Sequence, residues 1–143
     1  MKGINFGRVV LGGLLAGIVF NISEYLLNEK VMKSEMEAAM KALGKSGELT
    51  SSALTVWIIF GFVMGFLAVW LYAAVRPRFG AGAGTAARTG MFFWVMAGLL
   101  PSVAMWNVGL FPISWLALGW TLVEAMIATV AGAWLYKEDG AAA

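Results

Sequence analysis

The sequence has no cysteine, no histidine and few charged residues of either sign. These absences exclude disulfides, metal sites with Cys or His ligands, Cys nucleophiles, His-ligated haem and His general bases. Charged residues make up 13% of the chain and apolar residues 61%, whereas soluble domains have about 25% and about 45–50%. Because 143 residues cannot bury so much apolar surface in one small core, the composition excludes a soluble domain and predicts an integral membrane protein.

Two long uncharged stretches, residues 49–75 and 89–123, set the positions of the membrane spans. The first is long enough for one helix through a hydrocarbon core of about 30 Å. The second is too long for one helix, and turn-forming residues including Pro112 interrupt it near its middle. With the apolar run after Arg8, the sequence predicts an all-α fold, a four-helix transmembrane bundle that is a single transmembrane domain over residues 1–143. The spans are expected at about residues 9–27, 53–75, 87–106 and 114–136.

Local signals indicate how the spans begin and bend. Ser51 and Ser52 precede the second span, and we expect them to cap its first turn. Pro101 lies inside the third span. Because proline has no N–H to donate, we expect it to kink that helix.

The distribution of lysine and arginine predicts the orientation in the membrane. Six of the ten bases occur at the chain ends and between the second and third spans, whereas the first loop carries four lysines balanced by four glutamates. Cytoplasmic segments are enriched in Lys and Arg. We therefore expect a multi-pass protein with both termini in the cytoplasm.

The long first loop contains a helical pattern. Met32, Met36, Met40 and Leu43 recur at helical spacing, and Gly44 follows as a helix terminator. This pattern predicts an outer amphipathic helix between spans 1 and 2. One interpretation is an interfacial helix that covers the outer ends of the spans. The other is a docking surface for a partner, because flexible Met side chains suit adaptable contacts.

A glycine-rich segment, residues 80–84, joins the second and third spans. It does not match a phosphate loop, because no lysine follows it at the required position and no strand precedes it. We expect a flexible cytoplasmic turn. Three arginines beside it are expected to contact anionic lipid headgroups: Arg76, Arg78 and Arg88.

Glycines at four-residue spacing mark the expected helix contacts. Gly13 and Gly17 form one GxxxG pair in the first span, and Gly61 and Gly65 form another in the second. Glycine at this spacing lets two helix backbones approach closely in a membrane. We therefore predict that these four residues pack against neighbouring helices.

Two acidic residues lie within the spans. Glu124 is near the middle of the fourth span, and Glu24 is near the outer end of the first. An acid at membrane depth costs about 2.5–3.5 kcal/mol on insertion scales, so it is a functional candidate by default. Asn21 and Thr121 lie on the same helix faces and complete the set of intramembrane polar candidates.

These acids allow two interpretations. In the first, Glu124, with help from Glu24, is a proton-coupling or cation site. In the second, each acid is a hydrogen-bonded lock between helices. The expected lock partners are Asn21 or Asn107 for Glu24, and Thr121 or Trp115 for Glu124. Because the spans contain no base to pair with these acids, we favour the lock.

Three segments carry a resemblance to a known family. Residues 65–80 read GFLAVWLYAAVRPRFG, residues 99–102 read LLPS and residues 131–137 read AGAWLYK. Together they resemble an uncharacterised family of short bacterial membrane proteins with four predicted spans. The resemblance covers most of the chain except the first loop, and its most specific part is the WLYAAxRPRFG-type segment. It implies a location in the bacterial inner membrane, and it implies no activity and no functional residues.

Ser102 and Ser114 have no base or oxyanion motif beside them, so the sequence offers no catalytic residues and we expect no enzyme. The leading hypothesis is a small structural or auxiliary subunit that packs within a larger membrane assembly or with copies of itself. The alternative is a small proton- or cation-coupled carrier or channel that uses Glu124. We predict no cofactor and no metal, leave open a bound lipid or pigment, and expect the lipid bilayer and other membrane subunits, not nucleic acid, as partners.

Overall fold

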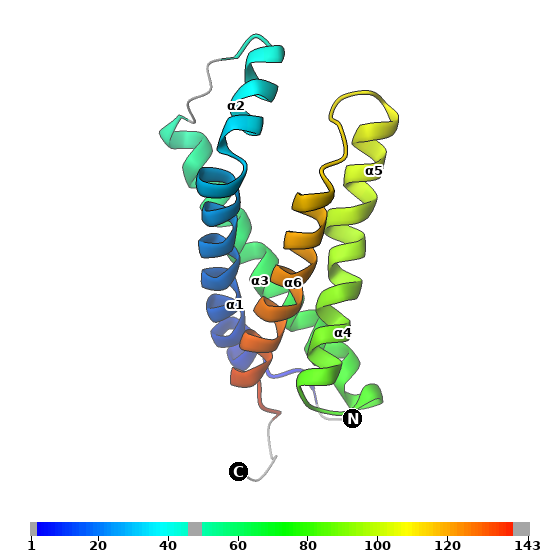
Figure 1. Ribbon diagram of the computed structural model, residues 1–143. Helices are drawn as coiled ribbons and strands as arrows, with labels where there is room; N and C mark the ends of the chain where they lie inside the picture. Colours follow the sequence, from blue (N-terminus) through cyan, green and yellow to red (C-terminus); the bar gives the residue numbers. More distant parts are fainter. Residues whose placement is uncertain (1–2, 46–49, 139–143) are drawn as a thin grey trace.

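The computed structural model describes residues 3–45 and 50–138, and these residues form helices and short connections with no strand. The elements are α1 (Phe6–Leu26), the π-helical turn η1 (Leu27–Val31), α2 (Lys33–Ala42), α3 (Ser51–Phe79), α4 (Ala83–Trp94), the π-helical turn η2 (Val95–Leu99), α5 (Leu100–Asn107) and α6 (Trp115–Leu135). Four stretches of the described chain are long and apolar enough to cross a membrane: Phe6–Val31, Ser51–Phe79, Ala83–Asn107 and Trp115–Leu135. The predicted all-α bundle with four spans is therefore confirmed (Figure 1).

The second span begins and ends differently from the prediction. Thr50 caps α3, since its hydroxyl accepts a hydrogen bond from the Ala53 N–H at 3.3 Å, so Ser51 and Ser52 are not the cap. The helix also continues through Pro77 to Phe79. A proline at this position removes only the one backbone hydrogen bond that its N–H would have donated to the carbonyl four residues earlier.

The third span changes its hydrogen-bond pattern just before Pro101. α4 leads into the π-helical turn η2, and α5 then begins with Pro101 in its first turn. The Leu100 N–H still bonds to the Val95 carbonyl in the π-helical pattern, so the wider turn comes directly before the residue that has no N–H to donate. A π-helical turn thus lies directly before Pro101, and the kink expected at this residue stays a prediction.

α1 and α3 meet at the four glycines of the two GxxxG pairs. A Cβ on Gly65 would lie 2.4 Å from the backbone nitrogen of Gly17 and 2.5 Å from the carbonyl oxygen of Gly13. A Cβ on Gly61 would lie 2.5 Å from the side-chain amide of Asn21. At Gly13, Gly17 and Gly65 the neighbouring backbone leaves no room for a side chain, so the two backbones approach as closely as the spacing predicts, whereas Gly61 makes room for a side chain of α1.

α6 is the central helix and packs against both α1 and α4. A Cβ on Gly132 would lie 2.6 Å from the carbonyl oxygen of Gly12 in α1, and a Cβ on Gly90 in α4 would lie 2.5 Å from that of Ala125. Gly12 and Gly90 have no glycine four residues away. The GxxxG pattern therefore missed these two close contacts.

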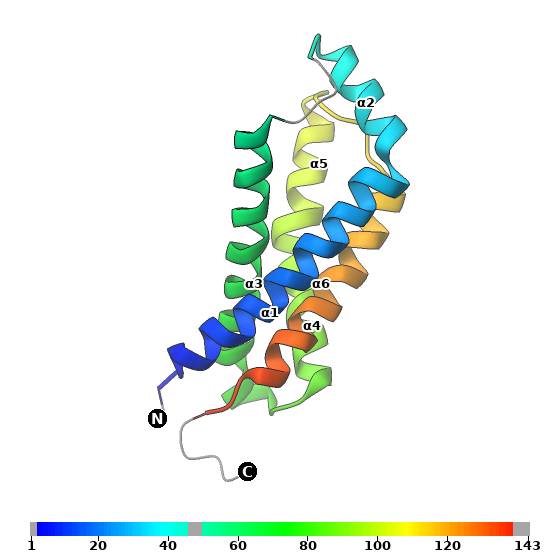
Figure 2. The ribbon, with the colours of Figure 1, turned by 90° about the vertical axis from the view of Figure 1, so that its left-hand side faces the viewer.

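The buried core lies toward the end of the bundle where α1 begins and α6 ends (Figures 1 and 2). We call this the inner end, and the end beside α2 the outer end. The core consists of Val9, Ala16, Phe20, Ala68, Val69, Tyr72, Ala73, Ala86, Phe93, Ala125, Ala128 and Tyr136. Most of these side chains are small, so the helices are close together at the inner end.

The outer half of the bundle is open. Every side chain from residue 54 to residue 60 on α3 is exposed, and so are all those of α5 except Ser102. Figure 1 places the outer ends of α3 and α5 on opposite sides of α6, and Figure 2 again separates α3 from α6. Here α1 reaches α3 through Asn21, whose side-chain amide donates to the Ile58 carbonyl at 3.2 Å. The spans therefore diverge toward the outer end.

The amphipathic helix predicted in the first loop is present as α2, and Gly44 follows it with φ 70°. α2 has no buried residue and packs chiefly on the turn η1 below it. Figures 1 and 2 show it above α1, extending away from the bundle. It does not cover the outer ends of the other spans, so the interpretation as a cover is wrong.

Candidate functional site

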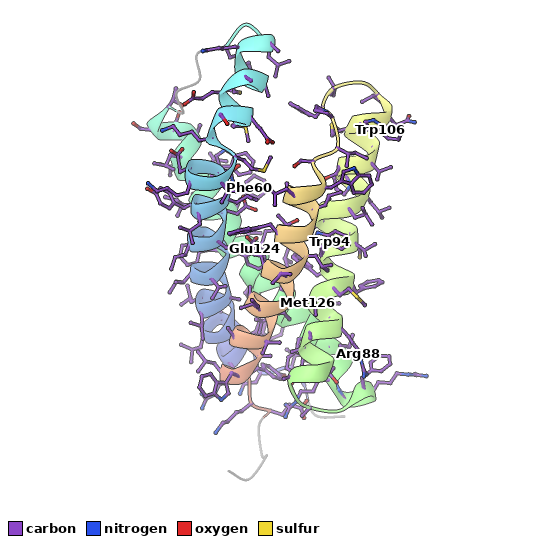
Figure 3. All side chains as sticks on the ribbon, viewed as in Figure 1. Phe60, Arg88, Trp94, Trp106, Glu124 and Met126 are labelled. Atoms are coloured by element: carbon purple, nitrogen blue, oxygen red, sulfur yellow. The ribbon has the colours of Figure 1, made fainter. Side chains whose placement is uncertain are left out.

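Glu124 lies at the contact between α6 and α1 (Figure 3). It is the tenth of the 21 residues of α6, and its side chain is 6% exposed. The face that α6 buries also carries Ala125, Ala128 and Gly132. Because α6 packs between α1 and α4, this face places a nearly buried acid at the middle of a span.

The Glu124 carboxyl is only partly satisfied. Ser23 on α1 makes a hydrogen-bonding contact with it across the helix interface. The Ser23 hydroxyl in turn accepts a hydrogen bond from the Trp120 indole N–H at 2.9 Å, so α6 contacts Ser23 twice. Among the described residues, none donates a hydrogen bond to Glu124 Oε2, although this oxygen is buried. An unsatisfied buried carboxyl oxygen is costly in a structural contact.

A shallow pocket of about 250 Å³ adjoins this carboxyl. Its lining comes from α1 and α6 and consists of Val19, Ile22, Ser23, Leu26, Glu124 and Ile127. Three of these residues, Ile22, Leu26 and Ile127, are exposed on the outside of the bundle. The pocket therefore opens toward lipid and is apolar except for Ser23 and the carboxyl.

Glu24 has a partner on its own helix. Its Oε2 accepts a hydrogen bond from Asn28 Nδ2 at 2.8 Å, and the same amide also donates to the Glu24 carbonyl at 2.9 Å. The predicted partners Asn21 and Asn107 are wrong, because Asn28 lies one turn away on the same face. Glu24 is also close enough to interact electrostatically with Glu124.

The other polar candidates connect helices without contacting the acids. The Asn21 amide donates to the Gly17 carbonyl at 2.8 Å and to Ile58 on α3. Thr121 donates to the Ala117 carbonyl at 2.8 Å and accepts from the Trp94 indole N–H at 3.1 Å. The predicted Glu124 partner Thr121 is therefore bonded to other groups.

The predicted partner Trp115 is also wrong. Its side chain is 77% exposed at the start of α6, more than two turns from Glu124. The sequence could not separate these candidates from Ser23, because Ser23 lies on another helix and reaches the acid only through the packing of α1 on α6.

Sequence reasoning missed a cluster at the inner end. Arg76 forms an ion pair with Glu138 at 3.3 Å, and its guanidinium lies 5.5 Å from the centre of the Tyr136 ring. The Tyr136 ring packs edge-on against Tyr72, whose hydroxyl accepts a hydrogen bond from the Gly82 N–H at 3.1 Å. Arg76 therefore joins the end of α3 to the chain after α6.

The other two arginines that were expected at lipid headgroups are Arg78 and Arg88, and both are exposed at the inner end. Figure 3 shows Arg88 extending away from the bundle. Of the three arginines, they are the two that the described residues leave without an ion pair.

Residues 3–45 and 50–138 contain no group of three or more acids, histidines or cysteines that could hold a metal ion. The site described above offers one carboxyl, one serine and an apolar wall. These groups can bind a hydrogen-bond donor or exchange a proton. Comparison with protein-family models, with curated proteins and with solved structures finds no match for this chain.

Proposed function

We propose that this protein is a non-enzymatic membrane subunit that self-associates through the outer half of α3. The observation that carries the proposal is the run of exposed side chains over residues 54–60. A helix packed on one neighbour buries a residue about every turn, and this run covers nearly two turns. The second span here gains little of the packing by which membrane helices associate.

The shape of this surface suits a neighbouring helix. Trp57 and Phe60 lie with ring centres 6.1 Å apart, and they line a surface hollow of about 350 Å³ together with Ser52, Ala53 and Val56. The Thr55 hydroxyl donates to the Ser51 carbonyl at 2.9 Å. The surface therefore needs shape complementarity and no polar partner.

A second copy of the chain is the occupant that this surface favours. The same surface on two copies can meet around a twofold axis, which is the commonest symmetry of protein oligomers. The neighbouring outer segment, residues 28–45, carries four lysines and three glutamates, so two copies bring little net charge together. An acidic or basic partner has no corresponding charge here to recognise.

Location and orientation follow from the sequence. We propose a bacterial inner membrane protein, as the resemblance carried by residues 65–80 implies, and we place both termini in the cytoplasm because the arginines gather at the inner end. The start of α1 and the end of α6 lie at this same end, which supports a common side for both termini (Figure 1).

Crosslinking of single cysteines in native membranes tests the self-association. The chain has no cysteine of its own, so each introduced thiol is unique. Ile59→Cys, at a side chain that is 56% exposed, should give a disulfide-linked product of twice the chain mass. The matched control is Leu67→Cys, which is 42% exposed on the inner half of the same helix and should stay monomeric.

Two outcomes would overturn the self-association. In one, Ile59→Cys gives no dimer or no more than Leu67→Cys. In the other, Ile59→Cys crosslinks instead to a product of a different mass, which would identify another subunit as the occupant.

A second candidate function is a small proton- or cation-coupled carrier or channel that uses Glu124. One observation favours it, since Glu124 Oε2 is buried without a hydrogen-bond donor among the described residues. The test is ion or proton flux into vesicles that contain the purified chain. Flux that Glu124→Gln abolishes would favour this candidate over the packing subunit.

A further inference from the structure

We propose that the pocket between α1 and α6 is a binding site for a lipophilic primary amine, whose ammonium pairs with Glu124 and whose apolar chain lies along Ile22, Leu26 and Ile127. The site does not involve the outer half of α3, so this inference stands apart from the proposed self-association.

One oxygen of the Glu124 carboxyl is buried without a hydrogen-bond donor among the described residues. Glu124 is 6% exposed, and it lines the pocket. The Ser23 hydroxyl, the other polar group of the lining, already accepts from the Trp120 indole at 2.9 Å. The free capacity of the pocket is therefore on a carboxyl oxygen, which as a carboxylate accepts a hydrogen bond from a ligand that donates.

The pocket also lacks a positive charge to pair with its acid. Glu124 is the one charged residue of α6, and Glu24 is the one charged residue of α1 beyond Arg8. Glu24 lies outside the lining and is hydrogen-bonded to Asn28, whereas no base on either helix accompanies Glu124 at its depth. An ammonium supplies both the missing donor and the missing positive charge, whereas an alcohol supplies only the donor.

The opening and the volume of the pocket indicate the shape of its ligand. It opens on the outside of the bundle between exposed aliphatic side chains, so a ligand enters from the hydrocarbon core of the membrane. Its volume of about 250 Å³ is below the range of roughly 300–1,000 Å³ for drug-sized ligands. A single alkyl chain with a small head fits these dimensions better than a ring system.

Equilibrium dialysis with a defined probe tests the site. Radiolabelled dodecylamine is dialysed against phosphatidylcholine nanodiscs that contain the full chain, and empty nanodiscs give the background from lipid partitioning. We expect saturable binding of one amine per chain. Unlabelled dodecanol should compete at least about tenfold more weakly than unlabelled dodecylamine, because a charged hydrogen bond is stronger than a neutral one.

Two variants remove the site in different ways. Glu124→Gln keeps the size of the side chain and removes the charge, and it should weaken amine binding at least about tenfold. Ile127→Trp fills the mouth of the pocket and leaves the carboxyl in place, and it should also abolish binding. Since Ile127 is 56% exposed, this change should leave folding intact.

Matched controls make the result specific. Glu24→Gln is the same chemical change at an acid outside the lining, and Leu116→Trp is the same kind of enlargement at another exposed residue of α6. Both should retain binding, and circular dichroism should show that all four variants are folded. The proposal is overturned if nanodiscs with the chain bind no more amine than empty ones, if Glu124→Gln binds as well as the native chain, or if dodecanol competes equally.

Discussion

Replacement of Gly65 by leucine should strongly destabilise the contact between α1 and α3. A Cβ at this position would lie 2.4 Å from the Gly17 nitrogen and 2.5 Å from the Gly13 oxygen, about 1 Å inside the 3.4 Å at which ordinary contact begins. Both neighbours are backbone atoms, which cannot move away by a change of rotamer. The two helices must therefore separate before the new side chain fits.

The size of the effect follows from two opposing contributions. Overpacking typically costs about 1–3 kcal/mol, and the rigid neighbours place Gly65→Leu at the upper end of that range. Removal of a glycine from a helix returns about 0.8–1 kcal/mol of helix propensity. The net loss of unfolding free energy should be about 2 kcal/mol.

Unfolding in mixed micelles by titration with dodecyl sulfate, followed by circular dichroism, measures this loss. Gly119→Leu is the matched control, because a Cβ there meets no atom within 4 Å, and it should leave stability unchanged or raise it by up to about 1 kcal/mol. Leu67→Ala, at a lipid-facing position of α3, should change stability by less than about 1 kcal/mol. Equal changes of unfolding free energy for Gly65→Leu and Gly119→Leu would show that the backbones of α1 and α3 do not meet closely at Gly65.

Three further changes test other contacts of the structure. Glu124→Leu should alter the unfolding free energy by less than about 1 kcal/mol, because it loses one interhelical contact and also removes the buried, unsatisfied Oε2. A loss above about 2 kcal/mol would instead show that the carboxyl is fully hydrogen-bonded between the helices. Glu138→Gln should speed tryptic cleavage after Lys137, because it breaks the ion pair with Arg76 that holds the segment after α6. Unchanged cleavage would show that the ion pair does not hold this segment. In whole cells, an impermeant maleimide should label a cysteine in place of Lys41 on α2 and not one in place of Gly84 at the inner end, whereas the opposite pattern would reverse the proposed orientation.

The spans could be predicted from the sequence because the length of an apolar run and the absence of charge are local properties. The same holds for the glycine pairs of α1 and α3, whose spacing alone places them on one face. Gly12 and Gly90 could not be found in this way. Each contacts the backbone of α6 from a different helix, so its role depends on how three helices are arranged.

The candidate site was predicted only in part. Glu124 was identified because an acid within a span is unusual, but its contact with Ser23 depends on the rotation of α1 against α6. Arg76 was assigned to lipid because it lies at a membrane border, whereas its partner Glu138 follows the last span by three residues. Pairing between distant segments leaves no periodic signal in the sequence, so neither contact could be read from it.

The openness of the outer half also could not be predicted. Residues 54–60 are apolar, and an apolar helix is compatible equally with a packed interior and with lipid. The exposure of residues 54–60 shows that this stretch is not packed inside the chain, in agreement with the divergence of α3 from α6 in Figures 1 and 2, and it carries the proposed self-association.

Single-molecule photobleaching tests that central claim most directly. The chain, labelled with one dye at Gly84→Cys on the exposed inner end, is reconstituted into vesicles at high lipid dilution. We expect most vesicles with fluorescence to bleach in two steps. Bleaching in one step at every dilution would contradict it, since the outer half of α3 would then face lipid alone.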